Sequence, residues 1–337
     1  MKSSFNIIQH CLFQPLKSKN NNIFSVQILF SHIRVPLLVS ILLTSLSRRV
    51  GAAEWRWGGK VAVVTGASSG IGAATALALA DKGVTVVGLA RRLDRILVSR
   101  NMLIRTNGTI HAIKCDLLKE EDILAAFRRI EQMLGGVDIL INNAGAGVSS
   151  TLAGEYKTED LQMVLNLNVL GVALATREAL KTMRTRGDDG YIININSLAG
   201  HRVPNFKMVS LGLYPASKFA LTAVSQTISN ELSDAQSRIK VTVRISPGLV
   251  NTEIVTNATH GFGAMNMLES VDIADSVIYI LSTRPNVQVH YKLCLLHFFS
   301  ISLIPPTNYY YSQSIILTLL ALKKKKGFFS RILLFLE

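Results

Sequence analysis

The stretch "TGASSGIG", residues 65–72, decides the fold of this chain. It follows the apolar run "KVAVV" and opens the alanine-rich segment "AATALALADK". Glycines at such a junction allow a tight turn and a close approach of the backbone to a phosphate, and they aim a helix N-terminus at that anion. A plain strand-to-helix turn is the alternative, but the position between a strand and a helix favours a dinucleotide site. The residues predicted to form it are Gly66, Ser68, Ser69, Gly70, Ile71 and Gly72.

Strand-like and helix-like segments alternate along the rest of the chain. The β-branched runs are "GVTVVGLA", "GTIHAIKCDL", "GVDILINNAG", "GYIININS" and "IKVTVRISPG", and the helical stretches include "EEDILAAFRRIEQML", "TREALKTMRTRG" and "YPASKFALTAVSQTISNEL". This alternation predicts an α/β fold with one Rossmann-type, doubly wound parallel sheet, helices on both faces, over residues 54–293. In the last helix, Ala220, Val224, Ile228 and Leu232 form an apolar stripe that we expect to face the core.

Composition and charge narrow the class of protein. The 337 residues are 49% hydrophobic and 17% charged, which suits one large core. The net charge is +14, but residues 1–53 and 276–337 carry +6 each, which leaves only +2 for residues 54–275. Such a nearly neutral core predicts no nucleic-acid partner. Cys11, Cys115 and Cys294 are odd in number and fit no metal-ligand pattern, so we expect no metal and a reducing, cytoplasmic location.

The two ends differ from this core. We expect residues 1–53 to be an N-terminal extension and residues 294–337 a divergent C-terminal tail, both outside the fold; an incorrect gene model is our hypothesis for them. The apolar segment 35–46 is shorter than the ~20 residues that span a bilayer. A signal anchor or peripheral membrane contact through it remains the less favoured alternative.

Two arginines end the second predicted strand, in "GLARR". An NAD site usually presents a carboxylate there to the ribose, whereas Arg91 and Arg92 match a 2′-phosphate, so NADP(H) is the predicted cofactor. A solvated arginine pair that opens a helix is the alternative. Asp116, which closes "IKCD", either bonds the adenine amino group or caps the following helix.

Tyr214 precedes Lys218 by four residues in "GLYPASKFALTAVSQ". Residues four apart share a helix face, so the ammonium can lie near the phenol. A cation there favours phenolate and brings a group with a pKa of ~10 toward acid/base chemistry at neutral pH. The pair also occurs by chance, as a half-buried tyrosine beside a solvated lysine.

Six motifs stand in a familiar order. After "TGASSGIG" come "NNAG" at 142–145, "NLNVLG" around Asn168, "IININS" ending at Ser197, "YPASK" and "ISPGLVNTE". Over residues 60–289 the chain thus resembles the short-chain dehydrogenase/reductase family. The runs "INSLAGHRV" and "LSTRPNVQVH" are similar to the farnesol dehydrogenase-like proteins of insects and to vertebrate relatives that reduce ketosteroids and other carbonyls.

The resemblance implies roles and partners. Tyr214 would be the general acid or base, Lys218 would hold the nicotinamide ribose and lower the pKa of the tyrosine, Ser197 would bind the substrate oxygen, and Asn168 would complete a water-linked proton relay. Taken alone, Ser197 could cap a turn and Asn168 could bond a neighbouring backbone. The substrate would be a small apolar alcohol or carbonyl compound, and a homodimer or homotetramer would form through the helices at "TREALKTM" and "YPASK". Further cofactor contacts would come from Asn143, Gly145, Pro247, Gly248, Val250 and Thr252.

Several features depart from the family pattern or leave alternatives open. The long segment between Ser197 and Tyr214 either borders the substrate mouth or packs internally, through Phe206, Met208, Val209 and Leu211. Residues 254–270, with Met265 and Met267, are predicted to form a mobile apolar cover. After Val289 the sequence "HYKLCLLHFF" diverges, so we expect the last edge strand to be lost. A catalytically silent NADPH-binding scaffold of the same fold is the alternative function.

Overall fold

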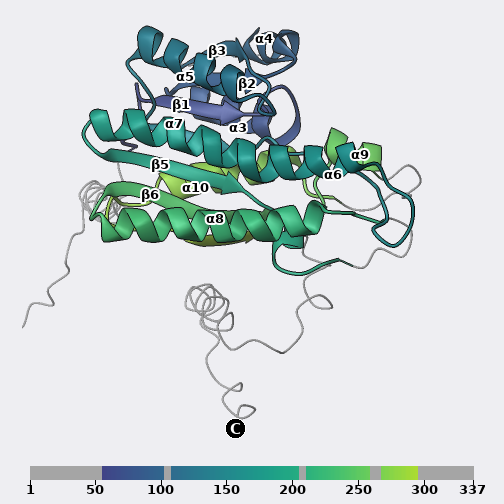
Figure 1. Cartoon of the computed structure of the whole chain (residues 1–337). Coiled ribbons are helices and arrows are strands. Elements are labelled where there is room, and N and C mark those ends of the chain that lie inside the picture. The colour runs from purple at the N-terminus through teal and green to yellow at the C-terminus, as the bar shows by residue number, and fades with distance from the viewer. Residues whose placement is uncertain (1–54, 102–107, 205–209, 259–266, 295–337) are drawn as a thin grey trace, which may run out of the picture. The chain divides into compact units, whose positions relative to one another are not determined.

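The computed structural model describes residues 55–101, 108–204, 210–258 and 267–294, which form a parallel sheet covered by helices (Figure 1). Within these residues the sheet has seven strands in the order β3-β2-β1-β4-β5-β6-β7, and every neighbouring pair is parallel. The predicted doubly wound α/β fold is confirmed. The strands are β1 Val61–Thr65, β2 Thr85–Ala90, β3 Thr109–Lys114, β4 Ile139–Asn142, β5 Asp189–Ile195, β6 Arg238–Pro247 and β7 Tyr291–Cys294.

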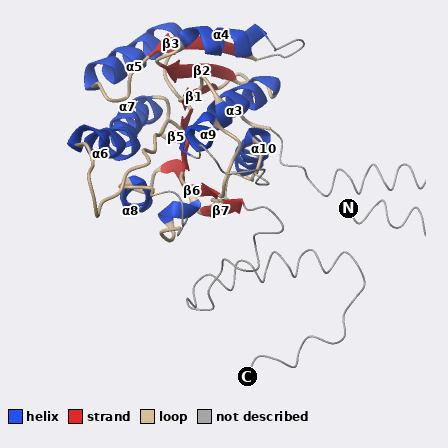
Figure 2. Cartoon of the chain, turned by 90° about the vertical axis from the view of Figure 1, so that its right-hand side faces the viewer, coloured by secondary structure: helices blue, strands red, loops and turns tan. Residues whose placement is uncertain are grey.

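Helices cover both faces of the sheet, as Figure 2 shows in edge-on view. On one face α3 (Gly70–Asp81), α4 (Leu93–Asn101) and α10 (Ser270–Leu281) bury residues such as Leu79, Ile96 and Val277. On the other face lie α5 (Glu120–Leu134), α7 (Val172–Thr185) and α8 (Tyr214–Asp234), with Phe127 and Met183 in the core. The strands between them are buried on both sides, which is why they read as continuous apolar runs.

The buried face of α8 lies beside the stripe predicted for it. Ala220, Val224 and Ile228 are half-buried, and the buried positions are Pro215, Ser217, Lys218, Leu221, Ser225, Ser229 and Leu232. The predicted stripe therefore borders the buried face: Leu232 belongs to the core and Ile228 packs against it. Two serines occupy the centre of this face because the Ser225 hydroxyl accepts a hydrogen bond of 2.8 Å from the Asn194 amide inside the sheet. Hydrophobic periodicity alone passes over such small polar contacts.

The expectation that the final edge strand is lost was wrong. β7 pairs with β6 from Arg244 opposite Tyr291 to Pro247 opposite Cys294. Main-chain hydrogen bonds form this ladder, and its side chains are exposed or half-buried, so the strand lacks the apolar run by which the other strands are recognised. Cys294 thus lies inside the sheet, one residue beyond the predicted domain boundary.

At the other end, the domain begins before its first strand. The Trp57 indole is buried and donates a hydrogen bond of 2.9 Å to the Leu281 carbonyl at the end of α10.

Helices α6 (Thr158–Leu165), η1 (Asn166–Gly171) and α7 run on continuously, and residues 158–185 are long and apolar enough to cross a membrane by length and composition. Because α7 packs its buried face on the sheet, we interpret this segment as a core helix.

Some predictions fall outside the described residues. These are the extension 1–53 with its apolar segment 35–46, the tail beyond Cys294, the loop residues Phe206, Met208 and Val209, and Met265 of the expected cover.

Candidate active site

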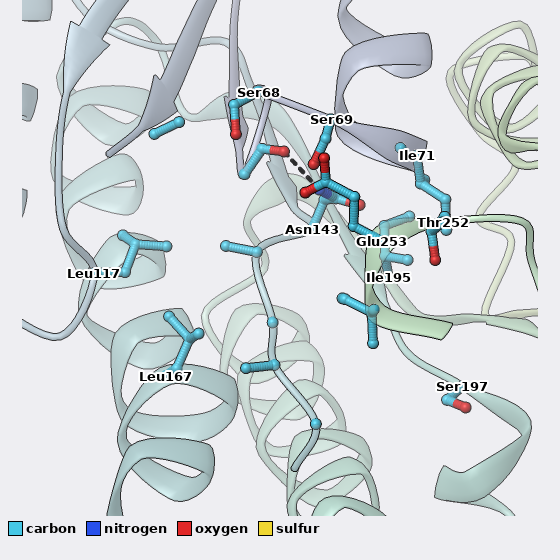
Figure 3. A pocket seen from close by; sticks show the side chains of 18 of the residues that line it. Ser68, Ser69, Ile71, Leu117, Asn143, Leu167, Ile195, Ser197, Thr252 and Glu253 are labelled. Atoms are coloured by element: carbon cyan, nitrogen blue, oxygen red, sulfur yellow. Dashed lines mark hydrogen bonds between the residues drawn. The ribbon is translucent and has the colours of Figure 1, made fainter. Parts of the chain in front are cut away.

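A cavity of about 570 Å³ opens among the loops that follow the carboxyl ends of the strands (Figure 3). Such crevices are where open α/β sheets bind ligands. Nearly all of the predicted site residues line it, and only Gly72 and Asn168 lie behind its wall. The predicted residues along the cavity are Gly66, Ser68, Ser69, Gly70, Ile71, Arg91, Arg92, Asp116, Asn143, Gly145, Ser197, Tyr214, Lys218, Pro247, Gly248, Val250 and Thr252.

The glycine turn has the geometry that its sequence predicts. Gly66 and Gly70 have φ values of +67° and +55°, in the left-handed region that side chains disfavour. A Cβ at Gly72 would lie 2.4 Å from both the Asn143 amide nitrogen and the Gly66 carbonyl oxygen, so only glycine fits there. The turn delivers the chain into α3, whose first N–H groups have no partner within the helix and open toward the cavity.

Hydrogen bonds between β1 and β4 hold this turn in place. The Asn143 amide donates to the Thr65 carbonyl at 2.9 Å, and the Asn143 and Ala144 N–H groups both donate to the Thr65 hydroxyl at 3.0 Å. Figure 3 shows the Asn143 side chain turned back toward the turn. The cavity floor is therefore fixed by the protein's own contacts, a structural role that is compatible with the predicted cofactor contact.

Tyr214, Lys218 and Ser197 meet at the other end of the cavity. The Lys218 ammonium lies 5.7 Å from the centre of the Tyr214 ring and donates a hydrogen bond of 3.1 Å to the Ile195 carbonyl. Ser197 lies near enough to the Tyr214 phenol to lower its pKa. Ser197 also accepts a bond from the Ala199 N–H at 3.1 Å, so it caps the short η2 helix (Leu198–Gly200) as well.

Burial controls the titration of this pair. Desolvation raises the pKa of the Tyr214 phenol, and the nearby Ser197 only partly offsets the rise. Desolvation also lowers the pKa of the Lys218 ammonium to about 8. In the protein alone burial is the largest influence on the phenol, so the pKa of Tyr214 lies above its ordinary value. The phenol is in its proton-donating form at neutral pH.

Asn168 lies in a π-helical turn behind this pair. Its amide accepts a bond from the Ala146 N–H at 2.9 Å and donates to the Ala146 carbonyl at 2.8 Å and to the Ser217 hydroxyl at 2.9 Å. Ser217 in turn donates to the Tyr214 carbonyl at 2.7 Å. Gly145 fits between these groups, because a Cβ there would lie 3.1 Å from the Asn168 oxygen and 3.8 Å from the Lys218 nitrogen. π-Turns inside helices are frequent at functional sites.

The predicted adenosine end carries the two arginines and Asp116. Arg91 is exposed and has no ion-pair partner among the described residues. Arg92 instead bonds the Glu253 carboxylate at 2.9 Å and the Ser69 hydroxyl at 3.3 Å. One Asp116 oxygen accepts a bond from the Leu118 N–H at 3.1 Å, so this side chain shapes a turn before α5 rather than capping the helix itself.

The segment after β6 closes the cavity. The Gly248 N–H donates to the Cys294 carbonyl of β7 at 2.8 Å, and Val250 forms an isolated parallel bridge with Leu268. Thr252 then contacts the glycine turn, because a Cβ at Gly70 would meet its methyl group at 3.0 Å. The edge strand therefore supports the loop that was predicted to flank the nicotinamide.

Sequence reasoning missed three contributors to the site. Thr65 fixes the glycine turn, Ser217 connects Asn168 to the tyrosine backbone, and Glu253 engages Arg92. "YPASK" already contains Ser217 and "ISPGLVNTE" ends in Glu253, so both stood inside motifs that had been noticed, but neither shows its partner in the sequence.

Known proteins resemble this chain in both sequence and structure. The family model described as short chain dehydrogenase matches residues 60–261. A farnesol dehydrogenase of Aedes aegypti is 49% identical over 236 residues, which cover 70% of this chain and 95% of that protein. Dehydrogenase/reductase SDR family member 11 of Bos taurus is 42% identical over 245 residues, with 69% and 94% covered. The crystal structure of a metagenomic short-chain oxidoreductase in complex with NADP superposes with a TM-score of 0.60 at 28% identity, covering 71% of this chain and 97% of that one.

Proposed function

Because the chain belongs to the short-chain dehydrogenase family, we propose that it is an NADP-dependent oxidoreductase that acts on the alcohol or carbonyl group of an apolar substrate. The observation that carries the proposal is the cluster of Ser197, Tyr214 and Lys218 at one end of a cavity whose other end is a glycine turn and a helix N-terminus. The described residues fit a dinucleotide, since the glycine turn leads into the N-terminus of α3 at the cavity and its glycines carry no side chain.

The proposed chemistry divides between cofactor and protein. When bound, NADPH supplies the hydride, which reaches the carbonyl carbon of the substrate. Tyr214 gives its phenolic proton to the carbonyl oxygen, and Ser197 donates a hydrogen bond to the same oxygen as negative charge develops on it. Lys218 holds a ribose hydroxyl, and its cationic charge favours proton release from the neighbouring phenol. In the reverse direction Tyr214 accepts the alcohol proton.

NADP(H) is favoured over NAD(H) on two grounds. Arg91 and Arg92 follow the end of β2, where an NAD site usually presents a carboxylate to the ribose, and Arg91 has no competing ion pair within the described residues. The metagenomic relative of known structure binds NADP.

A terpenoid alcohol such as farnesol, or a steroid, is the proposed substrate class. Its support is the 49% identity to the Aedes aegypti farnesol dehydrogenase. Apolar cavity residues agree with it, namely Leu118, Met163, Leu167, Ile254 and Val255.

We place the protein in the cytoplasm as a homodimer or homotetramer. Cys115 and Cys294 are both free thiols, which suits a reducing compartment. The outer surfaces of α7 and α8 are the proposed interface, and size-exclusion chromatography with light scattering tests it.

The decisive experiment measures oxidation of NADPH and NADH with farnesal, a steroid ketone and a polar ketose. Tyr214→Phe should reduce turnover of the apolar carbonyls at least about 100-fold, because the proton donor is lost, while its affinity for NADPH stays within about twofold. Tyr279→Phe, at an exposed tyrosine of α10, is the matched control and should be unchanged. NADPH binding without turnover on any carbonyl would instead identify a silent binding protein, and absence of NADPH binding would refute the proposal outright.

A further inference from the structure

Glu253 occupies an unusual position for a carboxylate, at the mouth of a cavity proposed to receive phosphates. It is the first residue of α9 (Glu253–Ala258) and lines the cavity. Figure 3 shows its side chain turned toward Ser69, the residue that precedes α3. An anion is favourable at such a helix N-terminus, so this carboxylate stands where a bound phosphate would also be attracted.

Arg92 of the predicted adenosine end and Arg95 of α4 hold this carboxylate. One Glu253 oxygen accepts a bond of 2.9 Å from Arg92, and the other contacts Arg95. The same Arg92 nitrogen lies 3.3 Å from the Ser69 hydroxyl. These hydrogen bonds, from Arg92 first and Arg95 next, keep the pKa of Glu253 below its ordinary value, so the group is charged at neutral pH.

Arg92 cannot serve Glu253 and a 2′-phosphate with the same atoms. The proposed function assigns Arg92 to that phosphate, together with Arg91. A phosphate beside Arg92 would also be repelled by the Glu253 carboxylate, because both are anions within a few ångströms of each other. A 2′-phosphate that takes the Nη2 group of Arg92 must therefore displace Glu253 from it.

We propose that Glu253 is a specificity-determining residue that competes with the cofactor 2′-phosphate for Arg92 and Arg95. The inference rests on the proposed function. The carboxylate neutralises the arginines until a ligand with a 2′-phosphate takes its place, and it thereby reduces the preference for NADP(H) over NAD(H). When the phosphate replaces the carboxylate, the contact between Glu253 of α9 and Arg95 of α4 is also broken. Helix α9 follows the loop on the nicotinamide side, and α4 lies on the adenosine side.

The test compares the wild-type protein with Glu253→Gln, which keeps the shape of the side chain and removes its charge. Adenosine 2′,5′-bisphosphate and adenosine 5′-monophosphate serve as probes in calorimetry, so the readout does not depend on turnover. We expect the variant to bind the bisphosphate about threefold to tenfold more tightly, the size expected from two exposed ion pairs. Binding of the monophosphate should change less than about twofold, and the gain should shrink in about 0.5 M salt.

Two further variants isolate the cause. Asp189→Asn breaks a comparable ion pair with Arg56. The side chains of Asp189 and Glu253 are 47% and 46% exposed. Asp189 lies at the amino end of β5, whereas Glu253 lies beyond the carboxyl end of β6. It should leave both probes unchanged. Adding Arg92→Gln to Glu253→Gln should abolish most of the gain.

Each outcome decides the inference. A tighter bisphosphate complex only in the Glu253 variant supports it. An unchanged or weaker complex overturns it and would mean that the carboxylate merely orients the arginines. A wild-type protein that binds NADPH while its Glu253 variant shows no altered discrimination refutes this inference alone, whereas a folded wild-type protein that binds neither NADPH nor NADH refutes the proposed function with it.

Discussion

Lys218 provides a sharp test, because the same burial that suits it to the site should destabilise the fold. The side chain is 5% exposed, and desolvation lowers its pKa from 10.5 to about 8. A shift of this size corresponds to roughly 3 kcal/mol of penalty on the charged form in the folded state at neutral pH. The hydrogen bond to the Ile195 carbonyl returns about 1–2 kcal/mol. Lys218→Met, which keeps the length of the side chain, should therefore raise the free energy of unfolding by about 1–2 kcal/mol at pH 7.

The pH dependence has a definite sign. Between pH 8 and 10.5 the unfolded chain keeps the Lys218 proton and the folded protein releases it, so the unfolded state binds more protons and the wild-type protein gains stability as the pH rises. The penalty is fully present below about pH 8 and disappears above about 10.5. The advantage of Lys218→Met should consequently narrow, by about 2 kcal/mol between pH 7 and 9.5.

The assay is urea unfolding followed by circular dichroism at several pH values, with thermal unfolding alongside. The melting temperature at pH 7 should rise by about 2–8 °C, given the size of the domain. Lys82→Met, at an exposed lysine after α3, should change stability by less than about 0.5 kcal/mol at every pH. A Lys218→Met protein that is less stable than wild type at pH 7, or a difference that does not change with pH, would refute this reasoning. Turnover should fall in Lys218→Met even though this variant is more stable. Such a result would indicate that Lys218 is retained for activity and not for stability.

Three further changes probe the frame around the site. Gly72→Ala should lower the free energy of unfolding by about 2–4 kcal/mol in urea titrations, because its Cβ would lie 2.4 Å from backbone and side-chain atoms; Gly58→Ala, whose Cβ would meet only a tryptophan ring atom at 4.0 Å, should be nearly neutral. Trp57→Phe should destabilise by about 1–2 kcal/mol in the same assay, since it leaves the buried Leu281 carbonyl without its donor. Ser217→Ala should lower kcat about tenfold with KM for NADPH unchanged, because the link between the π-turn and the tyrosine backbone is lost; an equal loss of both kcat and cofactor affinity would point to a collapsed site instead.

The parts of this fold that could be predicted from the sequence are those in which burial leaves a local trace. β1 and β4 are buried on both faces, so their sequences are continuous apolar runs. The turn after β1 is recognisable by its glycines, because residue 72 lies so close to a carbonyl oxygen that a side chain would not fit. β7 leaves no such trace, since main-chain bonds alone place it beside β6. The serines on the buried face of α8 could not be predicted, because a hydroxyl that accepts a hydrogen bond from a buried amide does not add to a hydrophobic pattern.

The same distinction applies to the site. Tyr214 and Lys218 are four residues apart, so a helix brings them together without further information. Glu253 and Arg92 are 161 residues apart in sequence. They become neighbours only in the folded protein, because each follows the carboxyl end of a strand of the parallel sheet. The residue types could be noticed in advance, but the competition between a carboxylate and a phosphate for one arginine could not.

The π-turn at Asn166–Gly171 has a consequence for protein engineering. A π-turn accommodates one residue more than the α-helix around it, so deleting a single residue from this segment would let it relax into regular helix. The deletion would thereby remove the local geometry that holds Asn168 against Ala146 and Ser217. Redesigned or truncated versions of this protein should therefore keep the length between Thr158 and Thr185 constant, even where individual side chains are exchanged.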